Sequence, residues 1–375
     1  MNKTIAVIEG DGIGPEVNKQ AIRVLDAVAE HFGHEFDYRY CLMGADAIDK
    51  TGTPLPDETI EICLNSDAIL FGAIGHPKYD NDPSAKVRPE QGLLKLRKAL
   101  QLFANIRPVN TYSSLFHLSP LKSKNLEGVD FIIFRELTGG IYFGNKETSP
   151  DGTRASDDCT YTRAEIERIA HLAFHFAEKP TRRKKLTLVD KANVLETSRL
   201  WRKVVQEIAP QYPSVTVEYM YVDNAAMQII QNPKQFDIIL TENMFGDIIS
   251  DEASVISGSL GLLPSASLAN GGNLALFEPI HGSYPQAAGK DIANPIGSIL
   301  SAAMLLEFLS MEEEAKLVRD AVNWTLLNSF VTKDIDPVNF YFTSTIGELI
   351  SDFVSGKIAG TVKTENIELR KSTII

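Results

Sequence analysis

Short apolar runs alternate along the chain with longer windows in which apolar residues recur every three or four positions. The short runs are typical of buried strands, and the periodic windows are typical of helices that bury one face. The pattern predicts strands at residues 5–8, 68–71, 129–134, 141–143, 186–189, 215–222 and 236–240. It predicts helices at residues 15–32, 91–102, 162–178, 194–208, 224–230, 245–256, 296–308, 312–328 and 345–354. This alternation indicates the α/β class.

Two of these helices begin with specific signals. Pro15 stands at a first helical position, where its missing N–H costs nothing. Thr162 and Glu165 have the spacing of a capping box.

The length and the order of elements indicate two domains. A chain of 375 residues is typical of two domains. Residues 105–257 form a complete unit between two halves of another, so we expect a discontinuous domain of residues 1–104 and 258–375 with residues 105–257 inserted. A Gly-, Ser- and Pro-rich stretch follows at residues 257–267, and the tail after residue 357 shows no period.

The composition excludes several classes of protein. Lys and Arg number 37 against 49 Asp and Glu, a formal net charge of −12, which argues against nucleic-acid binding. The basic run at residues 181–185 has no interleaved aromatic residues, so a solvated loop is favoured there. No apolar stretch is long enough to span a bilayer, and residues 5–8 are too few for a signal peptide. Three scattered cysteines argue against a disulfide framework, and we expect a cytoplasmic protein with no membrane or nucleic-acid partner.

Residues 10–15 (Gly-Asp-Gly-Ile-Gly-Pro) join a predicted strand to a predicted helix. The dinucleotide-binding fingerprint requires glycine at the sixth position, where close packing of helix on strand leaves no room for a ring. Pro15 occupies that position, so a Rossmann phosphate loop is excluded. A tight turn that needs positive φ angles is favoured over a ligand contact.

Asp247 and Asp251 are four residues apart on a predicted helix, so both carboxylates face the same side. Like charges at that spacing destabilise a helix, and a positive group should offset them. Carboxylate oxygens suit a hard cation such as Mg²⁺ or Mn²⁺, although a solvated helix face is the commoner interpretation.

Three arginines, Arg97, Arg107 and Arg135, stand near the ends of predicted elements. Guanidinium groups match carboxylates bidentately, so three that converge would bind a small di-acid. Each taken singly is more often part of a surface ion pair.

Lys191 follows the strand at residues 186–189, and ligands of α/β sheets gather at such strand ends. A nearby cation would lower its pKa, as a general base requires.

Tyr142 stands among three glycines and could donate a proton, although an ordinary strand aromatic is the simpler interpretation. Residues 278–283 and Asn294 could hold phosphates through backbone amides, and a plain turn is equally favoured.

Taken in order, these motifs resemble one family, the metal-dependent β-decarboxylating dehydrogenases, which include isocitrate, isopropylmalate and tartrate dehydrogenases. The matching stretches are residues 10–16, 105–108, 135–144, 190–193, 245–251, 278–283 and 292–295. The resemblance extends from the start of the chain to about residue 354. It implies a two-domain isocitrate/isopropylmalate dehydrogenase-like fold with a mixed sheet, which is not a Rossmann fold, and an active site shared across a homodimer.

The resemblance also implies roles by position. The substrate carboxylates would be bound by the three arginines named above. Mg²⁺ or Mn²⁺ would be bound by Asp247 and Asp251, with Asp223 of a second subunit, which also borders the substrate. Lys191 of that subunit would help to remove the hydroxyl proton, and Tyr142 would protonate the enol product.

Leu93 and Leu94 indicate the branch of the family. Isocitrate dehydrogenases carry a polar residue here for a third carboxylate, whereas two leucines suit an isopropyl group, whose burial gains about 1.5–3 kcal/mol. The resemblance therefore implies NAD-dependent oxidative decarboxylation of 3-isopropylmalate to 4-methyl-2-oxopentanoate and CO₂ in leucine biosynthesis.

NAD would lie along residues 281–294 and the segment around residues 75–90. The implied contacts are Glu90, His281, Gly282, Ser283, Gln286, Ala288 and Asn294. NAD-using members often carry an acid at the position of Gln286, so NAD is favoured but NADP stays open.

Two other functions stay open as well: a sister enzyme acting on tartrate, homoisocitrate or isocitrate, and a non-catalytic regulatory subunit. The two leucines argue against the first, and the complete set of base, acid and metal ligands argues against the second.

Overall fold

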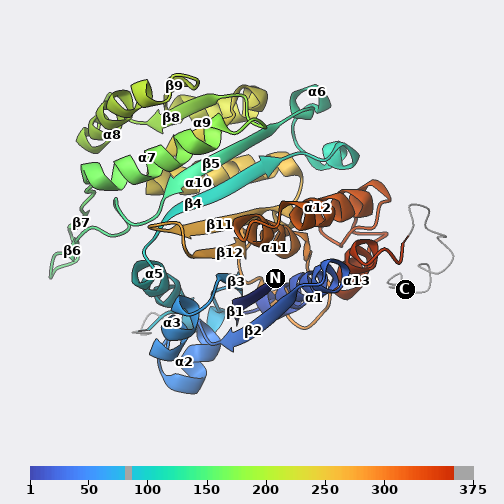
Figure 1. Ribbon diagram of the computed structural model, residues 1–375. Helices are drawn as coiled ribbons and strands as arrows, with labels where there is room; N and C mark the ends of the chain where they lie inside the picture. The colour runs from blue at the N-terminus through green and yellow to red at the C-terminus, as the bar shows by residue number, and fades with distance from the viewer. Residues whose placement is uncertain (81–86, 359–375) are drawn as a thin grey trace. The chain divides into compact units, whose positions relative to one another are not determined.

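The structure is a computed structural model that describes residues 1–80 and 87–358 (Figure 1). The chain divides into two compact units. Unit 1 comprises Met1–Leu100 and the chain from Gly258 onward, and unit 2 comprises Gln101–Ser257.

Unit 1 contains a mixed sheet. Its strands lie in the order β2 (Glu35–Cys41), β1 (Asn2–Gly10), β3 (Ala68–Ala73), β12 (Ala275–Pro279) and β11 (Pro264–Ala269). Only β11 runs antiparallel to its neighbour β12 among these pairings, and the others are parallel. Residues Ile5 to Ile8 of β1 have no exposed surface, because parallel strands that are covered on both faces are apolar throughout.

Helices cover this sheet. They are α1 (Gly14–Phe32), α2 (Ala45–Thr51), α3 (Asp57–Leu64), α4 (Pro77–Asp80), α5 (Pro89–Ala99), α11 (Ile296–Phe308), α12 (Glu312–Leu327) and α13 (Thr343–Val354), with short 3₁₀ helices at Leu260–Leu262 and Pro285–Ala287. α11 packs on β11 and β12 and against α1 and α12, which explains why it is apolar on nearly every side. Within the described residues, no helix has the length and apolar character that a membrane crossing requires.

Unit 2 also contains both parallel and antiparallel strand pairs. Its strands lie in the order β4 (Leu102–Asn110), β5 (Asp130–Glu136), β10 (Ile238–Thr241), β8 (Lys185–Asp190) and β9 (Thr216–Tyr221). β4 is antiparallel to β5, and the other pairs are parallel. The strand ends of β5, β8 and β10 therefore meet at one edge, where the helices that follow β8 and β10 begin.

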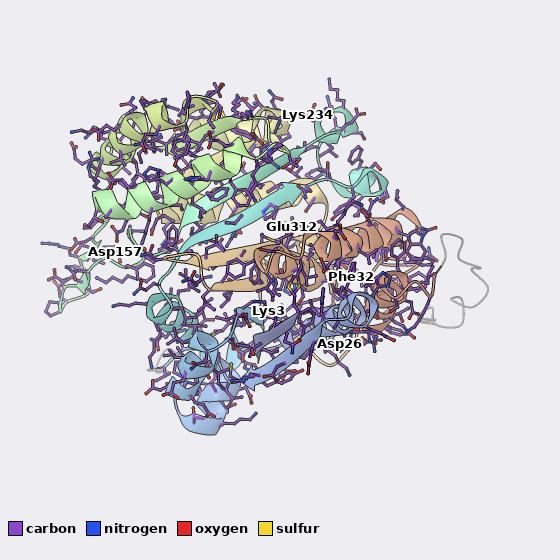
Figure 2. All side chains as sticks on the ribbon, viewed as in Figure 1. Lys3, Asp26, Phe32, Asp157, Lys234 and Glu312 are labelled. Atoms are coloured by element: carbon purple, nitrogen blue, oxygen red, sulfur yellow. The ribbon has the colours of Figure 1, made fainter. Side chains whose placement is uncertain are left out.

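Helices and a hairpin complete unit 2. The helices are α6 (Ser123–Leu126), α7 (Arg163–Glu178), α8 (Glu196–Ile208), α9 (Val222–Gln231) and α10 (Asn243–Ser254), with 3₁₀ helices at Ser113–Leu118, Ala209–Gln211, Pro233–Gln235 and Val255–Ser257. α7 packs with α8, and α9 packs with α10. The hairpin of β6 (Lys146–Thr148) and β7 (Ala155–Asp157) is exposed along both strands, and Figure 2 marks it at Asp157.

Most predicted elements are confirmed, and one is wrong. The Thr162–Glu165 capping box opens α7, with both reciprocal hydrogen bonds present. The predicted strand at residues 141–143 is instead a turn, in which the Phe143 amide donates to the Gly140 carbonyl at 3.2 Å. Gly140 has a φ of 76°, which bends the chain away from an extended course.

Several strands were absent from the prediction, among them β2 and β11. β2 lies at an edge, so its outward residues are polar and its apolar content is low. β11 falls largely in the Gly-, Ser- and Pro-rich stretch, and its pairing with β12 makes it a strand.

The prediction of a solvated basic loop is wrong for Arg182, whose side chain is only 9% exposed. Its guanidinium donates to Asp130 at 3.0 and 3.1 Å and to Asp237 at 2.8 Å. Asp237 is buried, and a buried carboxylate requires such a partner. Arg182 therefore links the start of β5, at Asp130, to the start of β10, directly after Asp237.

Candidate active site

Two acids and two arginines meet in unit 2. Asp247 and Asp251 lie one turn apart on α10. Arg107 of β4 contacts both, with Nη1 3.2 Å from Asp251 Oδ1 and Nη2 3.6 Å from Asp247 Oδ1. Nη1 of Arg135, on β5, donates to Asp247 Oδ1. The positive charge that the spacing of the acids requires is therefore supplied by two strands far away in sequence.

Asn243, the first residue of α10, aligns Arg135. Its Oδ1 accepts from Nε and Nη2 of Arg135 at 3.0 and 2.9 Å. Its Nδ2 donates to the Gly139 carbonyl at 3.2 Å. The amide thus holds one side of the guanidinium while the other side meets Asp247. Sequence reasoning missed Asn243, because a lone Asn at a helix start resembles an ordinary capping residue.

Tyr142 lies in the turn that follows Gly139. Its hydroxyl donates to Asp247 Oδ2 at 3.0 Å, and the guanidinium of Arg135 lies 5.8 Å from its ring centre. Burial, and then the negative charge of Asp247, raise the pKa of Tyr142. A phenol with a raised pKa keeps its proton at neutral pH and can supply it to a bound substrate.

Tyr161 and Glu242 support this cluster from within unit 2. Glu242 accepts the Tyr161 hydroxyl at 3.0 Å and the Phe245 amide at 3.1 Å, and it thereby caps the start of α10. The Asn243 amide donates to the same hydroxyl at 3.0 Å. Burial raises the pKa of Glu242 against these hydrogen bonds.

Lys191 and Asp223 form a separate pair in unit 2. Lys191 follows β8, and its Nζ donates to Asp223 Oδ1, in the first turn of α9, at 2.6 Å. The backbone amide of Lys191 donates to Ser198 Oγ at 3.0 Å, which fixes the residue at the strand end. The hydrogen bond from Lys191 lowers the pKa of Asp223.

The three acids expected to bind metal are not gathered in one copy of the chain. In the described residues, no three His, Cys, Asp or Glu side chains stand together in a way that could hold a metal ion. Asp247 and Asp251 share α10, whereas Asp223 is paired with Lys191.

Unit 1 carries the remaining residues expected to meet the substrate, all on α5. Arg97 donates to Glu278 at 3.1 Å and is mostly buried. Leu93 and Leu94 lie one turn before it and are partly exposed. Glu90 is exposed at the start of α5, beside Gly75. The expected cofactor segment around residues 75–90 also includes residues 81–86, which lie outside the described residues.

The turn at residues 10–15 positions the loop after β12. Gly10 and Gly12 have φ angles of 71° and 61°, as expected for the turn. A side chain on Gly12 would strike the Ser283 carbonyl. That carbonyl accepts the Ile13 amide at 2.8 Å, so the turn holds the loop in place.

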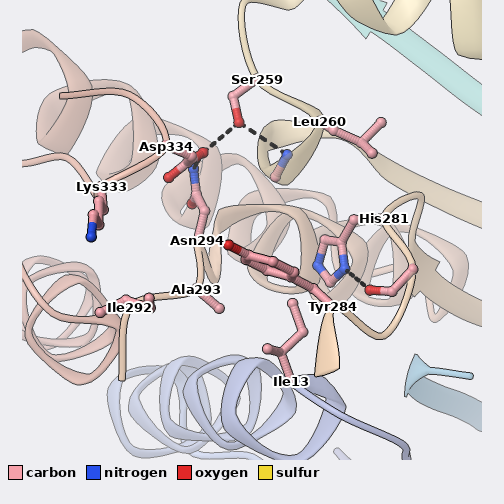
Figure 3. Close-up of a pocket in the computed structure, with 12 residues that line it drawn as sticks. Ile13, Ser259, Leu260, His281, Tyr284, Ile292, Ala293, Asn294, Lys333 and Asp334 are labelled. Atoms are coloured by element: carbon pink, nitrogen blue, oxygen red, sulfur yellow. Dashed lines mark hydrogen bonds between the residues drawn. The ribbon is translucent and has the colours of Figure 1, made fainter. Parts of the chain in front are cut away.

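This loop borders a pocket of about 540 Å³ in unit 1 (Figure 3). Ile13, Leu260 and Ile292 give it apolar walls, and Asn294 and Asp334 give it polar groups. The Asp334 carboxylate accepts the Asn294 side-chain amide at 3.1 Å and also the Ser259 hydroxyl.

His281 is a lining residue of this pocket, and one of its ring nitrogens has no partner among the described residues. Its Nδ1 lies 2.9 Å from the Gly282 carbonyl, which can only accept, so Nδ1 carries the proton. Its Nε2 is buried and has no hydrogen-bond partner in the part of the chain that the structure describes. Burial lowers the pKa of His281, which keeps the imidazole neutral and Nε2 an acceptor.

Only some of the expected cofactor residues line the pocket. His281, Gly282 and Asn294 do, whereas Gln286 and Ala288 are exposed on the loop outside the lining. Ser283 is buried beneath it. Tyr284, Ile292 and Ala293 also line the pocket and fall within the expected segment 281–294, although they were not singled out. Sequence reasoning missed Ile13, Ser259, Leu260, Gly261, Lys333 and Asp334, which come from three separate segments with no shared pattern.

Comparisons with known proteins agree over nearly the whole chain. The isocitrate/isopropylmalate dehydrogenase family matches residues 4–350. A 3-isopropylmalate dehydrogenase of Bacteroides fragilis is 56% identical over 356 residues, which cover 94% of this chain and 99% of that protein. Another, of Bacillus subtilis, is 55% identical over 340 residues, with 89% and 92% covered. The crystal structure of isocitrate dehydrogenase from Methylococcus capsulatus is similar, with a TM-score of 0.84 and 33% identity over 94% of this chain and 99% of that one.

Proposed function

This chain belongs to the isocitrate/isopropylmalate dehydrogenase family, and on that premise we propose that it oxidises and decarboxylates 3-isopropylmalate with NAD as a step of leucine biosynthesis. The products are 4-methyl-2-oxopentanoate, CO₂ and NADH. The observation that carries the proposal is the cluster in which Arg107, Arg135 and Tyr142 surround Asp247. The names of relatives more than half identical to this chain support the choice of substrate.

The side chains divide the work between binding and proton transfer. Arg107 and Arg135 bind carboxylate oxygens of the substrate, as their paired N–H groups allow. Arg97 binds a carboxylate from α5, where Leu93 and Leu94 receive the isopropyl group. Oxidation removes the hydroxyl proton and a hydride, and decarboxylation then leaves an enol that needs a proton at carbon.

Lys191 and Tyr142 are assigned to the two proton transfers. The partner subunit's Lys191 takes the hydroxyl proton at Nζ. In the free chain Nζ donates to Asp223, so it must first lose a proton, which a cation bound by Asp223 would favour. Tyr142 gives its hydroxyl proton to the enol carbon, and its raised pKa keeps that proton available. Asp247 orients the Tyr142 hydroxyl through their 3.0 Å hydrogen bond.

The residues present fit a divalent cation. Asp247 and Asp251 offer carboxylate oxygens, which Mg²⁺ and Mn²⁺ prefer, and the partner subunit's Asp223 would complete the set. When bound, the cation would polarise the hydroxyl and the carbonyl that replaces it. The arginines that now meet these acids would turn to the substrate carboxylates.

A dimer is supported by an apolar surface on α9 and α10. Met227 on α9, Ile248 on α10 and Val255 directly after α10 are exposed, and the last two lie on the same side because they are two turns apart. Exposed apolar surface of this kind marks an interface, and a second copy would bring Lys191 and Asp223 to the metal site.

The pocket in unit 1 fits the adenosine part of NAD. Apolar walls suit a flat base, and Asn294 and Asp334 in the lining offer polar groups to the N–H and O–H groups that adenosine carries. NAD is favoured over NADP because Asp334 places a carboxylate in the lining and would repel an added phosphate. The nicotinamide of the bound cofactor would accept the hydride.

The test follows NADH by absorbance with 3-isopropylmalate, NAD and Mg²⁺, together with released CO₂. We expect one CO₂ for each NADH, loss of activity with a chelator, and recovery with Mg²⁺ or Mn²⁺. kcat/KM should be higher with NAD than with NADP. A higher kcat/KM for isocitrate, homoisocitrate or tartrate would show a sister enzyme, and dinucleotide binding without turnover of any of the four would show a regulatory subunit.

A further inference from the structure

Tyr284 has an unusual backbone and an unusual exposure. Its φ and ψ are 37° and 62°, in the left-handed region that a residue with a β-carbon enters only at a cost. The backbone on both sides is fixed: the Ser283 carbonyl accepts the Ile13 amide at 2.8 Å, and the Tyr284 carbonyl accepts the Ala287 amide at 3.0 Å. Strain that is held in this way at a pocket points to a function for the side chain.

The ring of Tyr284 lies at the pocket instead of in the core. The residue is 56% exposed, yet it is one of the lining residues. Figure 3 shows the ring extending from the loop toward Asn294, in the same pocket as His281 and Ile13. A large aromatic face is thus presented beside apolar walls.

We propose that Tyr284 stacks its ring on the adenine base of the dinucleotide cofactor. The proposal deepens the proposed function and rests on it. A phenol ring and a purine stack through their faces, and the apolar walls made by Ile13 and Ile292 exclude water from the other side of the base. Stacking also explains why the position holds an aromatic residue at a backbone conformation suited to glycine.

The experiment measures binding of ADP-ribose, which carries the adenosine half of NAD without nicotinamide, by isothermal titration calorimetry. Tyr284→Ala should raise the Kd about 10- to 100-fold, as the loss of one base–aromatic stack does. Tyr284→Phe should keep the affinity near that of the wild type, because the ring remains. Tyr40→Ala is the matched control, since Tyr40 is also 56% exposed in unit 1 but is not a lining residue, and its Kd should not change.

Tyr284→Gly separates stacking from a structural role. Glycine relieves the left-handed strain, so the free protein should melt at a higher temperature than Tyr284→Ala while it binds ADP-ribose equally weakly. A Kd of Tyr284→Ala within twofold of the wild type would overturn the proposal, and so would a wild type that does not bind ADP-ribose. If the wild type turns over 3-isopropylmalate and Tyr284→Ala binds ADP-ribose as tightly as the wild type, only the stacking role of Tyr284 fails. If the wild type produces no NADH, the proposed function itself fails.

Discussion

Removal of the Asn243 side chain should separate the alignment of Arg135 from the general stability of unit 2. Asn243 is 1% exposed, and Asn243→Ala removes the acceptor of two Arg135 N–H groups and the donor to the Gly139 carbonyl. A hydrogen bond to a charged group contributes about 1.5–3 kcal/mol and a neutral one about 0.5–1.5 kcal/mol. One oxygen serves both Arg135 N–H groups, so we count them as a single contact with a charged group. The loss should therefore be about 2–4.5 kcal/mol, and kcat/KM should fall by about 30- to 2,000-fold if all of it appears in the transition state.

Asn243→Asp separates the contribution of the contact with Arg135 from that of the contact with the Gly139 carbonyl. One carboxylate oxygen of the aspartate can still accept from Arg135. The other oxygen replaces the N–H donor that faced the Gly139 carbonyl, and the two oxygens repel each other. Arg135 should stay aligned, so KM for 3-isopropylmalate should stay near that of the wild type. The turn that carries Tyr142 should be displaced, so kcat should fall. In Asn243→Ala both constants should worsen.

Steady-state kinetics on the three proteins, with thermal unfolding of each, test this division. Asn18→Ala is the matched control, because Asn18 is fully buried in unit 1 and makes hydrogen bonds to Ile8 and Ser298 at 3.1 and 3.0 Å. Asn18→Ala should lose about as much stability as Asn243→Ala, but under conditions in which it is folded its kcat should equal that of the wild type. Equal kcat for Asn243→Ala and Asn18→Ala would refute the alignment of Arg135 by Asn243.

The other predictions concern the base, a buried acid and the dimer. Lys191→Met should fold and bind substrate but lose turnover by orders of magnitude, and a near-normal kcat in rapid-mixing or steady-state assays would remove Lys191 from the mechanism. The pKa of Glu242 is raised above its ordinary value of 4.5, so its contribution to stability is present below pH 4.5 and is lost as the pH rises through the folded pKa. Denaturant titrations should thus show wild type losing stability relative to Glu242→Gln as the pH rises toward neutrality, and a constant difference would contradict this sign. Ile248→Asp places a charge on the exposed apolar side of α10 and should give inactive monomers in sedimentation velocity; an active dimer would place the interface elsewhere.

Local signals in the sequence predicted those elements whose structure is decided locally. The capping box at Thr162 and the apolar run at Ile5–Ile8 each specify one structure, and both are present. The strand expected at residues 141–143 failed, because aromatic residues favour a strand only where a neighbouring strand accepts them. Beside Gly140 the chain turns back instead. β11 was missed because its own residues do not favour a strand. It is a strand because it pairs with β12, and that pairing cannot be predicted from either segment alone.

The same distinction applies to the candidate site. The spacing of Asp247 and Asp251 showed that both face one side and need a positive partner, but Arg107 could be joined to them only through resemblance to a family. That family knowledge assigns residues that touch ligands. It gave no reason to examine Asn243, which acts through Arg135, or Tyr284, whose significance lies in a φ angle that no sequence pattern displays.

These two residues also allow the functions of the two units to be tested apart. Every residue that lines the pocket proposed to bind adenosine belongs to unit 1, whereas Asn243 and the groups that it holds belong to unit 2. Asn243→Ala should therefore leave the Kd for ADP-ribose unchanged, and Tyr284→Ala should leave the affinity for 3-isopropylmalate unchanged in the absence of NAD. Mutations with no shared partners have additive free energies, so the double variant should show the product of the two single effects on kcat/KM. A smaller combined effect would mean that cofactor binding in unit 1 already depends on how Arg135 is held in unit 2.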